Sequence, residues 1–180
     1  MFRKHRVKAV LYLITSAIGL ITAWTLNALA VFDQADYLAA WFGSAVDWVL
    51  SIDLLVVGVA VAIFMISEAR RLGMKRVWLY FLLSGMTAIA FTFPLFMFSR
   101  ERKLLSIRLG GGKLQQFEFD SHRVDVWVPE TLNPKTPVVL MHDGRNLFDE
   151  LDTFTGKTWE VIPAIRDEVR GEKPLVVGVW

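Results

Sequence analysis

The stretch SIDLLVVGVAVAIFMISEARRLGMKRVWLY, residues 51–80, decides the architecture of this chain. It joins a long apolar run to a short basic turn, a pattern typical of a membrane-spanning helix and the loop after it. We expect the span to cover residues 45–67, which include Asp47 and Asp53. The uncharged part, residues 54–67, is too short to cross about 30 Å of hydrocarbon, so the span has to include Asp53.

Two further uncharged stretches, residues 9–32 and 77–99, flank this segment. Each exceeds the roughly 20 residues that a helix needs to cross a bilayer. The sequence therefore predicts a transmembrane domain of three helices over residues 1–103, with Pro94 bending the third helix. The composition agrees, because 54% of the 180 residues are hydrophobic and the mean hydropathy is +0.41. A cleavable signal peptide ending near residues 28–30 is an alternative interpretation of the first span.

Basic residues predict the orientation in the membrane. They precede the first span and fill the second loop, and they are Arg3, Lys4, Arg6, Lys8, Arg70, Arg71, Lys75 and Arg76. Since basic segments stay in the cytoplasm, we expect the N-terminus and the second loop inside. Three crossings would then put the C-terminal segment outside, in the periplasm. Arg100, Arg102 and Lys103 oppose that last step.

Several function classes have little support. Twenty basic against 18 acidic residues give no sign of a nucleic-acid partner, and the absence of cysteine excludes a thiol nucleophile. His122 and His142 are too widely spaced to suggest a metal site, and we expect no cofactor. Asp53 is the one residue of the membrane part for which we consider a function, because it could take part in binding a proton or an ion. The simpler interpretation is that Asp53 caps or hydrogen-bonds a neighbouring helix.

Residues 104–180 have the composition of a soluble segment. Residues 104–109 and 114–119 flank a glycine-rich turn and could pair as a hairpin. Alternating or continuous apolar residues predict strands in RVDVWVP, VVLM and PLVVGVW. Residues 157–171 are expected to form a helix, with Trp159, Ile162, Ile165 and Val169 on one face. This order predicts the opening of an α/β sheet.

Residues 12–102 resemble a family of small bacterial integral-membrane domains of unknown function. The resemblance rests on the quoted stretch of residues 51–80 and on FTFPLFMFSRER, residues 91–102. It implies a three-span fold in the bacterial inner membrane, with the lipid bilayer as partner. It implies no activity.

Residues 123–180 resemble the opening of bacterial esterases with the α/β-hydrolase fold, related to enterochelin esterase and esterase D. The carrying segments are RVDVWVP, PVVLMHDGRNLFDELDTFTGKTWEV and PLVVGVW. The resemblance implies a serine nucleophile with a His base and an acidic partner. It also implies that the loop Asp143, Gly144, Arg145 and Asn146 supplies backbone N–H groups to an oxyanion hole.

No G-x-S-x-G occurs in the chain, and in that family the nucleophile, acid and base come after the point where this chain stops. We therefore expect no catalytic residue here and an incomplete esterase-like domain over residues 104–180. The first hypothesis is a membrane-anchored serine hydrolase acting on small esters, inactive as this chain alone. The alternative is a non-catalytic three-span membrane protein, a scaffold or partner-binding module, with a remnant soluble tail.

Overall fold

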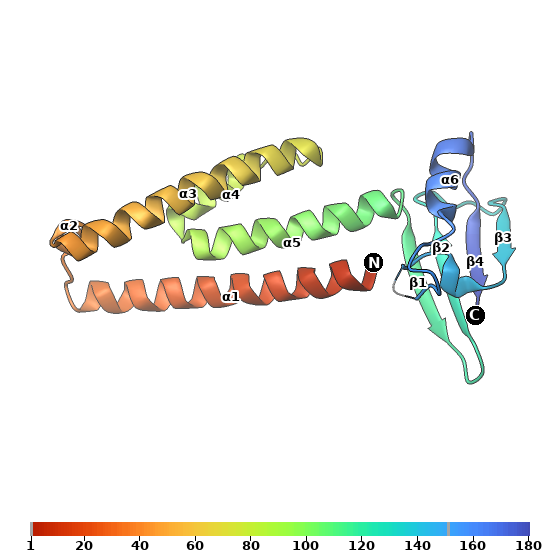
Figure 1. Cartoon of the computed structure of the whole chain (residues 1–180), viewed down its shortest axis with the longest axis horizontal. Coiled ribbons are helices and arrows are strands. Elements are labelled where there is room, and N and C mark those ends of the chain that lie inside the picture. The colour runs from red at the N-terminus through yellow and green to blue at the C-terminus, as the bar shows by residue number, and fades with distance from the viewer. Residues whose placement is uncertain (1, 151) are drawn as a thin grey trace. The chain divides into compact units, whose positions relative to one another are not determined.

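The computed structural model describes residues 2–150 and 152–180, and the side chains of Phe2 and Arg3 lie outside the described part. The chain divides into two compact units. A helical unit comprises residues 8–100, and a sheet unit comprises residues 101–180 together with residues 1–7. The helices of the first part are α1 (Phe2–Phe32), α2 (Tyr37–Phe42), α3 (Ala45–Arg71), α4 (Trp78–Met86) and α5 (Ile89–Arg108) (Figure 1).

Two of these helices, α1 and α3, are long and apolar enough to cross a membrane. The first two expected spans therefore coincide with single helices. A capping box starts α3, in which the Ser44 hydroxyl and the Asp47 carboxylate each accept a hydrogen bond from the other residue's backbone N–H. This box explains why a carboxylate stands at the beginning of an otherwise apolar helix.

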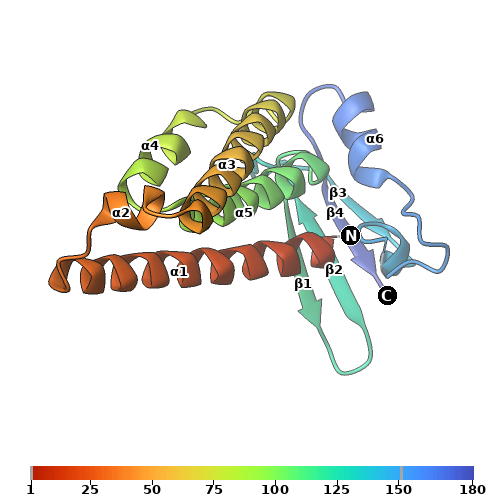
Figure 2. The same ribbon diagram turned by 60° about the vertical axis from the view of Figure 1, so that its left-hand side comes forward.

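The third expected span, residues 77–99, is not one helix. Its first part forms α4, Thr87 leaves the helical conformation with φ −123° and ψ −94°, and α5 begins at Ile89. The chain turns back at this break, because the Tyr80 ring of α4 packs edge-on against Phe96 of α5 at 5.5 Å. The Tyr80 hydroxyl also lies 2.8 Å from Ser99 Oγ. The segment is thus a helical hairpin (Figure 2), with Pro94 inside its second limb.

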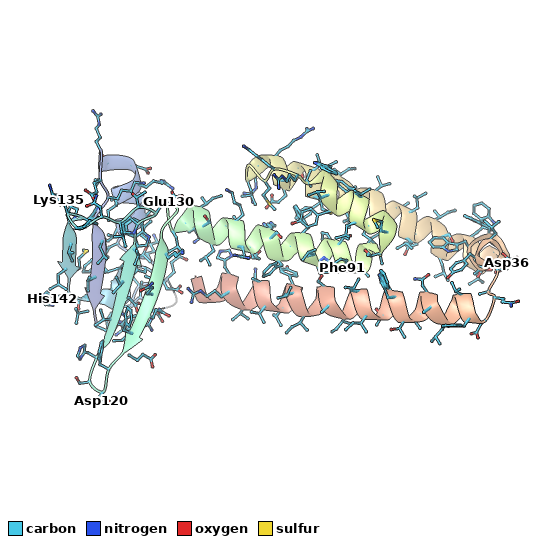
Figure 3. The ribbon with its side chains drawn as sticks, turned by 180° about the vertical axis from the view of Figure 1, so that it is seen from behind. Asp36, Phe91, Asp120, Glu130, Lys135 and His142 are labelled. Carbon is cyan, nitrogen blue, oxygen red and sulfur yellow. The ribbon has the colours of Figure 1, made fainter. Side chains whose placement is uncertain are left out.

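Small residues allow α1 to pack closely against α5. The hydroxyl of Ser16 donates to the carbonyl oxygen of Phe91 at 3.0 Å, and Phe91 lies where α5 runs beside α1 (Figure 3). One turn further along α1, a Cβ atom on Gly19 would lie 2.3 Å from the carbonyl oxygen of Ala90. Pro94 cannot donate to that carbonyl as the residue four positions later normally does. The two helices run antiparallel.

The direction of α5 differs from the expectation of three alternating crossings. Phe64 of α3 packs against Phe93 and Phe96 of α5, and Glu68 pairs with Arg100, so α3 and α5 run parallel. The end of α3, the start of α1 and Arg100 therefore lie at one end of the helical unit. The physical reason is the hairpin, because α4 reverses the chain before α5 returns.

The sheet unit contains four strands: β1 (Lys113–Glu118), β2 (Arg123–Val128), β3 (Val138–Met141) and β4 (Leu175–Val179). Their order is β1-β2-β4-β3. β2 is antiparallel to β1 and β4, whereas β3 and β4 are parallel. A short 3-10 helix, η1 (Gly144–Asn146), and α6 (Val161–Glu168) lie between β3 and β4. The strands expected in residues 123–180 are present, but residues 104–108 continue α5, so the first expected hairpin is wrong.

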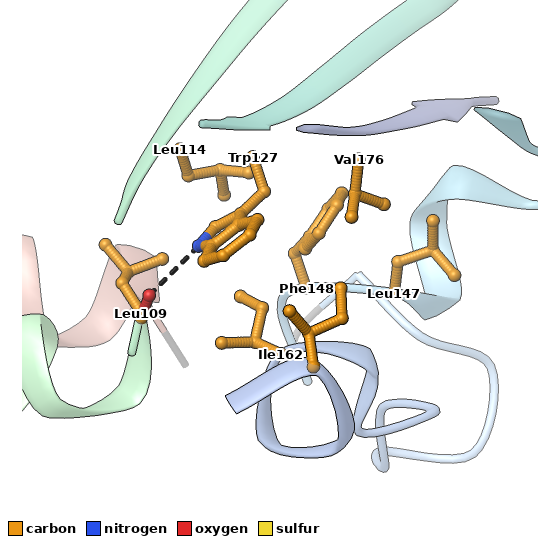
Figure 4. Close-up of a cluster of buried hydrophobic side chains, with 8 residues drawn as sticks. Leu109, Leu114, Trp127, Leu147, Phe148, Ile162 and Val176 are labelled. Atoms are coloured by element: carbon orange, nitrogen blue, oxygen red, sulfur yellow. Dashed lines mark hydrogen bonds between the residues drawn. The ribbon is translucent and has the colours of Figure 1, made fainter. Parts of the chain in front are cut away.

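The core of the sheet unit lies between the sheet, the end of α5 and α6. Trp127 of β2 is fully buried, and its indole N–H donates to the carbonyl oxygen of Leu109 at 3.0 Å (Figure 4). Ile162 and Ile165 of α6 pack into the same cluster. The helix expected over residues 157–171 is shorter than predicted, because Glu160 has a positive φ of 55° and α6 begins after it.

Candidate functional site

The most buried ionic cluster of the helical unit centres on Glu68, in the last turn of α3. Glu68 is only 8% exposed. Its carboxylate accepts hydrogen bonds from Arg71, at 2.7 Å to Nε and 2.6 Å to Nη2, and from Nε of Arg100 at 2.6 Å. Two guanidinium groups thus hold one carboxylate and join α3 to α5. Such charge-assisted pairs are strong and geometrically specific, and both oxygens of Glu68 are satisfied.

Three other cations of the same region are not neutralised. Arg70, Lys75 and Arg76 are exposed, and no carboxylate pairs with them among the residues that the structure describes. Arg76 has a positive φ of 69°, so the turn between α3 and α4 holds it in a conformation that side-chain-bearing residues rarely adopt. This arrangement leaves fixed positive charge that can attract an anion.

Asp53 lies on α3 with its side chain exposed. Within the described part of the chain its carboxylate has no hydrogen-bond or ion-pair partner. The expected cap or hydrogen bond to a neighbouring helix is therefore not found, and Asp47 performs the capping. A single carboxylate without a second ligand gives no geometry for an ion site.

The loop expected to supply oxyanion N–H groups follows β3 directly. Asp143 adopts a left-handed conformation, with φ 54°, and Gly144 begins η1. Gly144 packs against β4 so closely that a Cβ atom would lie 2.7 Å from the carbonyl carbon of Gly178. The N–H of Asn146 donates to the carbonyl of Asp143 at 2.9 Å, so this N–H serves the turn itself.

The side chain of Arg145 holds the following segment in place. Its Nε donates to the carbonyl oxygen of Asp152 at 3.2 Å, and its guanidinium lies 3.9 Å from the ring centre of Phe154. Arg145 is the one cationic side chain of the loop, and these two contacts engage it in holding the following segment. The loop therefore lies at the end of an early strand, the position that the resemblance implies, but the Asn146 N–H and the Arg145 guanidinium are engaged in structural contacts.

The histidines are in different surroundings. His122 stacks on Phe119 at 5.1 Å near the β1–β2 turn, whose tip carries Asp120, and His142 lies at the end of β3 (Figure 3). No group of three metal-binding side chains occurs among residues 2–150 and 152–180. The acidic loop residue Asp149 is buried.

Sequence reasoning missed two ion pairs. Asp125 is buried, and its carboxylate accepts hydrogen bonds from Nε and Nη2 of Arg123 at 2.8 and 3.0 Å. The Arg123 guanidinium also lies 4.0 Å from the Trp180 ring centre. The alternation of RVDVW offered a signal, since residues 123 and 125 share one face of a strand. The spacing of Glu68 and Arg71 offered another. Nothing local indicated that Arg100 joins Glu68.

Comparison with known proteins identifies a family. A family model described as protein of unknown function DUF2834 matches residues 11–102. This range agrees with the resemblance noted for residues 12–102. No curated protein and no solved structure matches the chain. The esterase resemblance of residues 123–180 has no support from these comparisons.

Proposed function

We propose, from the premise that this chain belongs to the DUF2834 family of proteins of unknown function, that it is a non-catalytic membrane protein whose helical unit is the functional part. The observation that carries the proposal is the apolar outer surface of α1 and α3. Large side chains such as Ile21 and Leu55 are about two-thirds exposed, at 65% and 66%. Surfaces of this kind and extent require lipid or a partner to cover them.

The same proposal includes a topology with two full crossings, by α1 and α3. α4 has nine residues and is about 13 Å long at 1.5 Å per residue, too short for about 30 Å of hydrocarbon. The uncharged part of α5, residues 89–99, is about 16 Å long by the same rise. The hairpin of α4 and α5 would thus enter the membrane and return, which is tolerated where protein covers the irregular backbone.

This topology would put the sheet unit in the cytoplasm with the N-terminus, in place of the periplasmic position expected from three crossings. The parallel direction of α3 and α5 supports it, because Glu68 and Arg100 meet at one end. The basic residues that opposed the three-crossing scheme, Arg100, Arg102 and Lys103, now follow the positive-inside rule. A bacterial inner membrane is the proposed location.

The absence of cysteine makes the topology directly testable. Single variants Ala35→Cys, between α1 and α2, and Ser121→Cys, between β1 and β2, would be treated with a membrane-impermeant maleimide in intact bacteria. We expect labelling of Ala35→Cys in intact cells and of Ser121→Cys only after lysis. Labelling of Ser121→Cys in intact cells would contradict the topology, and release of the chain by carbonate would contradict membrane insertion. The intact mass of the purified protein tests retention of α1.

A second candidate is a membrane-anchored ester hydrolase to which residues 104–180 would contribute opening strands. The mixed sheet supports it, since an antiparallel pair precedes a strand–helix–strand crossover into the parallel pair β3 and β4. Its test is the gene sequence beyond the codon for Trp180. A continuing frame with G-x-S-x-G, and turnover of p-nitrophenyl esters by that protein, would favour it over the non-catalytic proposal. A stop codon would exclude it.

A further inference from the structure

We infer that the groove between α4 and α5 binds one anionic phospholipid, with the headgroup phosphate on Lys75 and Arg76 and an acyl chain along Leu79, Leu83 and Leu95. The inference rests on the proposed membrane insertion and adds a specific ligand to it. The groove has a volume of about 360 Å³ and is lined by these five residues and Tyr80.

The groove has two chemically different ends. Lys75 and Arg76 stand at its mouth, directly before α4 begins. Leu79 and Leu83 are four residues apart and so lie on one face of α4. Leu95 of α5 faces them across the groove. Two cations beside a continuous apolar wall match an amphiphile with an anionic head, and pockets of this kind between membrane helices bind acidic lipid headgroups.

One residue of the groove wall, Tyr80, is held in place by contacts with α5. Tyr80 is fixed by its 2.8 Å hydrogen bond to Ser99 and by its edge-on contact with Phe96. The groove is therefore formed before any ligand binds, which reduces the entropic cost of binding.

The cations at the mouth are available for an anion. Arg71 and Arg100 are engaged by Glu68, whereas Lys75 and Arg76 have no carboxylate partner among the described residues. A free phosphate would leave the leucine wall empty, and a neutral lipid would leave the cations without a counter-ion. An anionic phospholipid satisfies both.

The depth of the groove fits one leaflet. α4 is about 13 Å long by its helical rise, close to half of the hydrocarbon thickness. Trp78 is 59% exposed beside the cations, and tryptophan prefers the headgroup level of a bilayer. The acyl chain would thus run from this level toward the bilayer centre along α4.

The test uses the full chain in detergent, with native mass spectrometry of phosphatidylglycerol and phosphatidylcholine retention. We expect the wild type to retain phosphatidylglycerol selectively. A Lys75→Gln/Arg76→Gln variant should bind it about 25-fold more weakly, at about five-fold for each cation lost. Arg70→Gln is the matched control, because Arg70 is also exposed and unpaired among the described residues but lies outside the groove. Its effect should stay below about two-fold.

A second pair of variants tests the apolar wall. Leu83→Asn should weaken retention, whereas Leu82→Asn, on an exposed position of the same helix and outside the groove, should not. Equal retention of both lipids, equal effects of Arg70→Gln and the double variant, or full competition by inorganic phosphate would each overturn the inference. Carbonate extraction separates the two proposals: a chain that stays in the membrane without lipid selectivity overturns only the lipid site. A chain released as soluble protein overturns both.

Discussion

Removing the Glu68 carboxylate should destabilise the helical unit far more than removing the exposed guanidinium of its partner Arg71. The side chain of Glu68 is 10% exposed and that of Arg100 is 20% exposed, whereas Arg71 is 60% exposed. In Glu68→Gln both guanidinium groups lose the charge of this shared carboxylate at once. Breaking a buried pair by deleting one partner costs roughly 3–5 kcal/mol.

Arg71→Gln provides the matched control, because it removes a guanidinium from the same carboxylate at its exposed side. An exposed pair contributes about 0–1 kcal/mol, so this variant should remain close to the wild type. For a chain of this size, about 2–4 °C of melting temperature corresponds to each kcal/mol. We therefore expect Glu68→Gln to melt roughly 10 °C lower and Arg71→Gln to melt within about 4 °C of the wild type.

The assay is thermal unfolding of the full chain in detergent, followed by circular dichroism at the helical band. Arg100→Gln and the double variant Glu68→Gln/Arg100→Gln complete a cycle that isolates the coupling of these two side chains. A coupling free energy near zero, or equal losses for Glu68→Gln and Arg71→Gln, would refute the assignment of this ion pair as the link between α3 and α5.

Three further predictions concern single sites. Gly19→Ala should weaken packing of α1 on α5 and lower the melting temperature in the same assay, because its Cβ would lie 2.3 Å from a backbone oxygen. Gly58→Ala is the control, because its Cβ would lie 3.9 Å from the nearest side-chain atom. This variant should be neutral or stabilising by up to about 1 kcal/mol. An equal loss in both would contradict the close approach. Trp127→Phe should lower the stability of the sheet unit by about 1–3 kcal/mol, since the hydrogen bond to Leu109 disappears. The sheet unit should therefore be proteolysed faster, and unchanged cleavage kinetics would argue against that bond. Asp53→Asn should change the free energy of unfolding by no more than about 0.5 kcal/mol. A large shift of the melting temperature would reveal a partner for this carboxylate.

Sequence patterns predicted local structure in this chain well where one interaction dominates. Long, mainly apolar runs placed α1 and α3, because helix length and hydropathy suffice to find such segments. Alternation of Val124, Val126 and Val128 with Asp125 and Trp127 placed β2. The segment of residues 104–109 misled, because its apolar residues suit a strand and a helix equally, and the continuing backbone hydrogen bonds of α5 decided the outcome.

The candidate site was less accessible from sequence. The partners Glu68 and Arg100 are 32 positions apart, and no periodicity relates residues on different helices. Asp53 drew attention because a charge in an apolar run is costly, yet it has no partner among the described residues. The carboxylate that joins α3 to α5 is that of Glu68, in the last turn of the same helix. It lies in the segment SEARR, where neighbouring charged residues made an acidic residue unremarkable.

The direction of the chain after α3 shows why hydropathy alone cannot give a topology. An uncharged run over residues 77–99 has the same composition whether it forms one crossing helix or a hairpin of two short ones. Residues with low helix propensity, Gly85 and Thr87, interrupt the run near its middle, and Pro94 leaves one carbonyl without its usual helical donor. On the neighbouring α1, Gly19 lies against that carbonyl of Ala90, and Ser16 donates to the next one, that of Phe91. The hairpin therefore depends on a second helix, and its consequence is that every basic segment of the helical unit gathers at one end, where charge counting along the sequence had found a conflict.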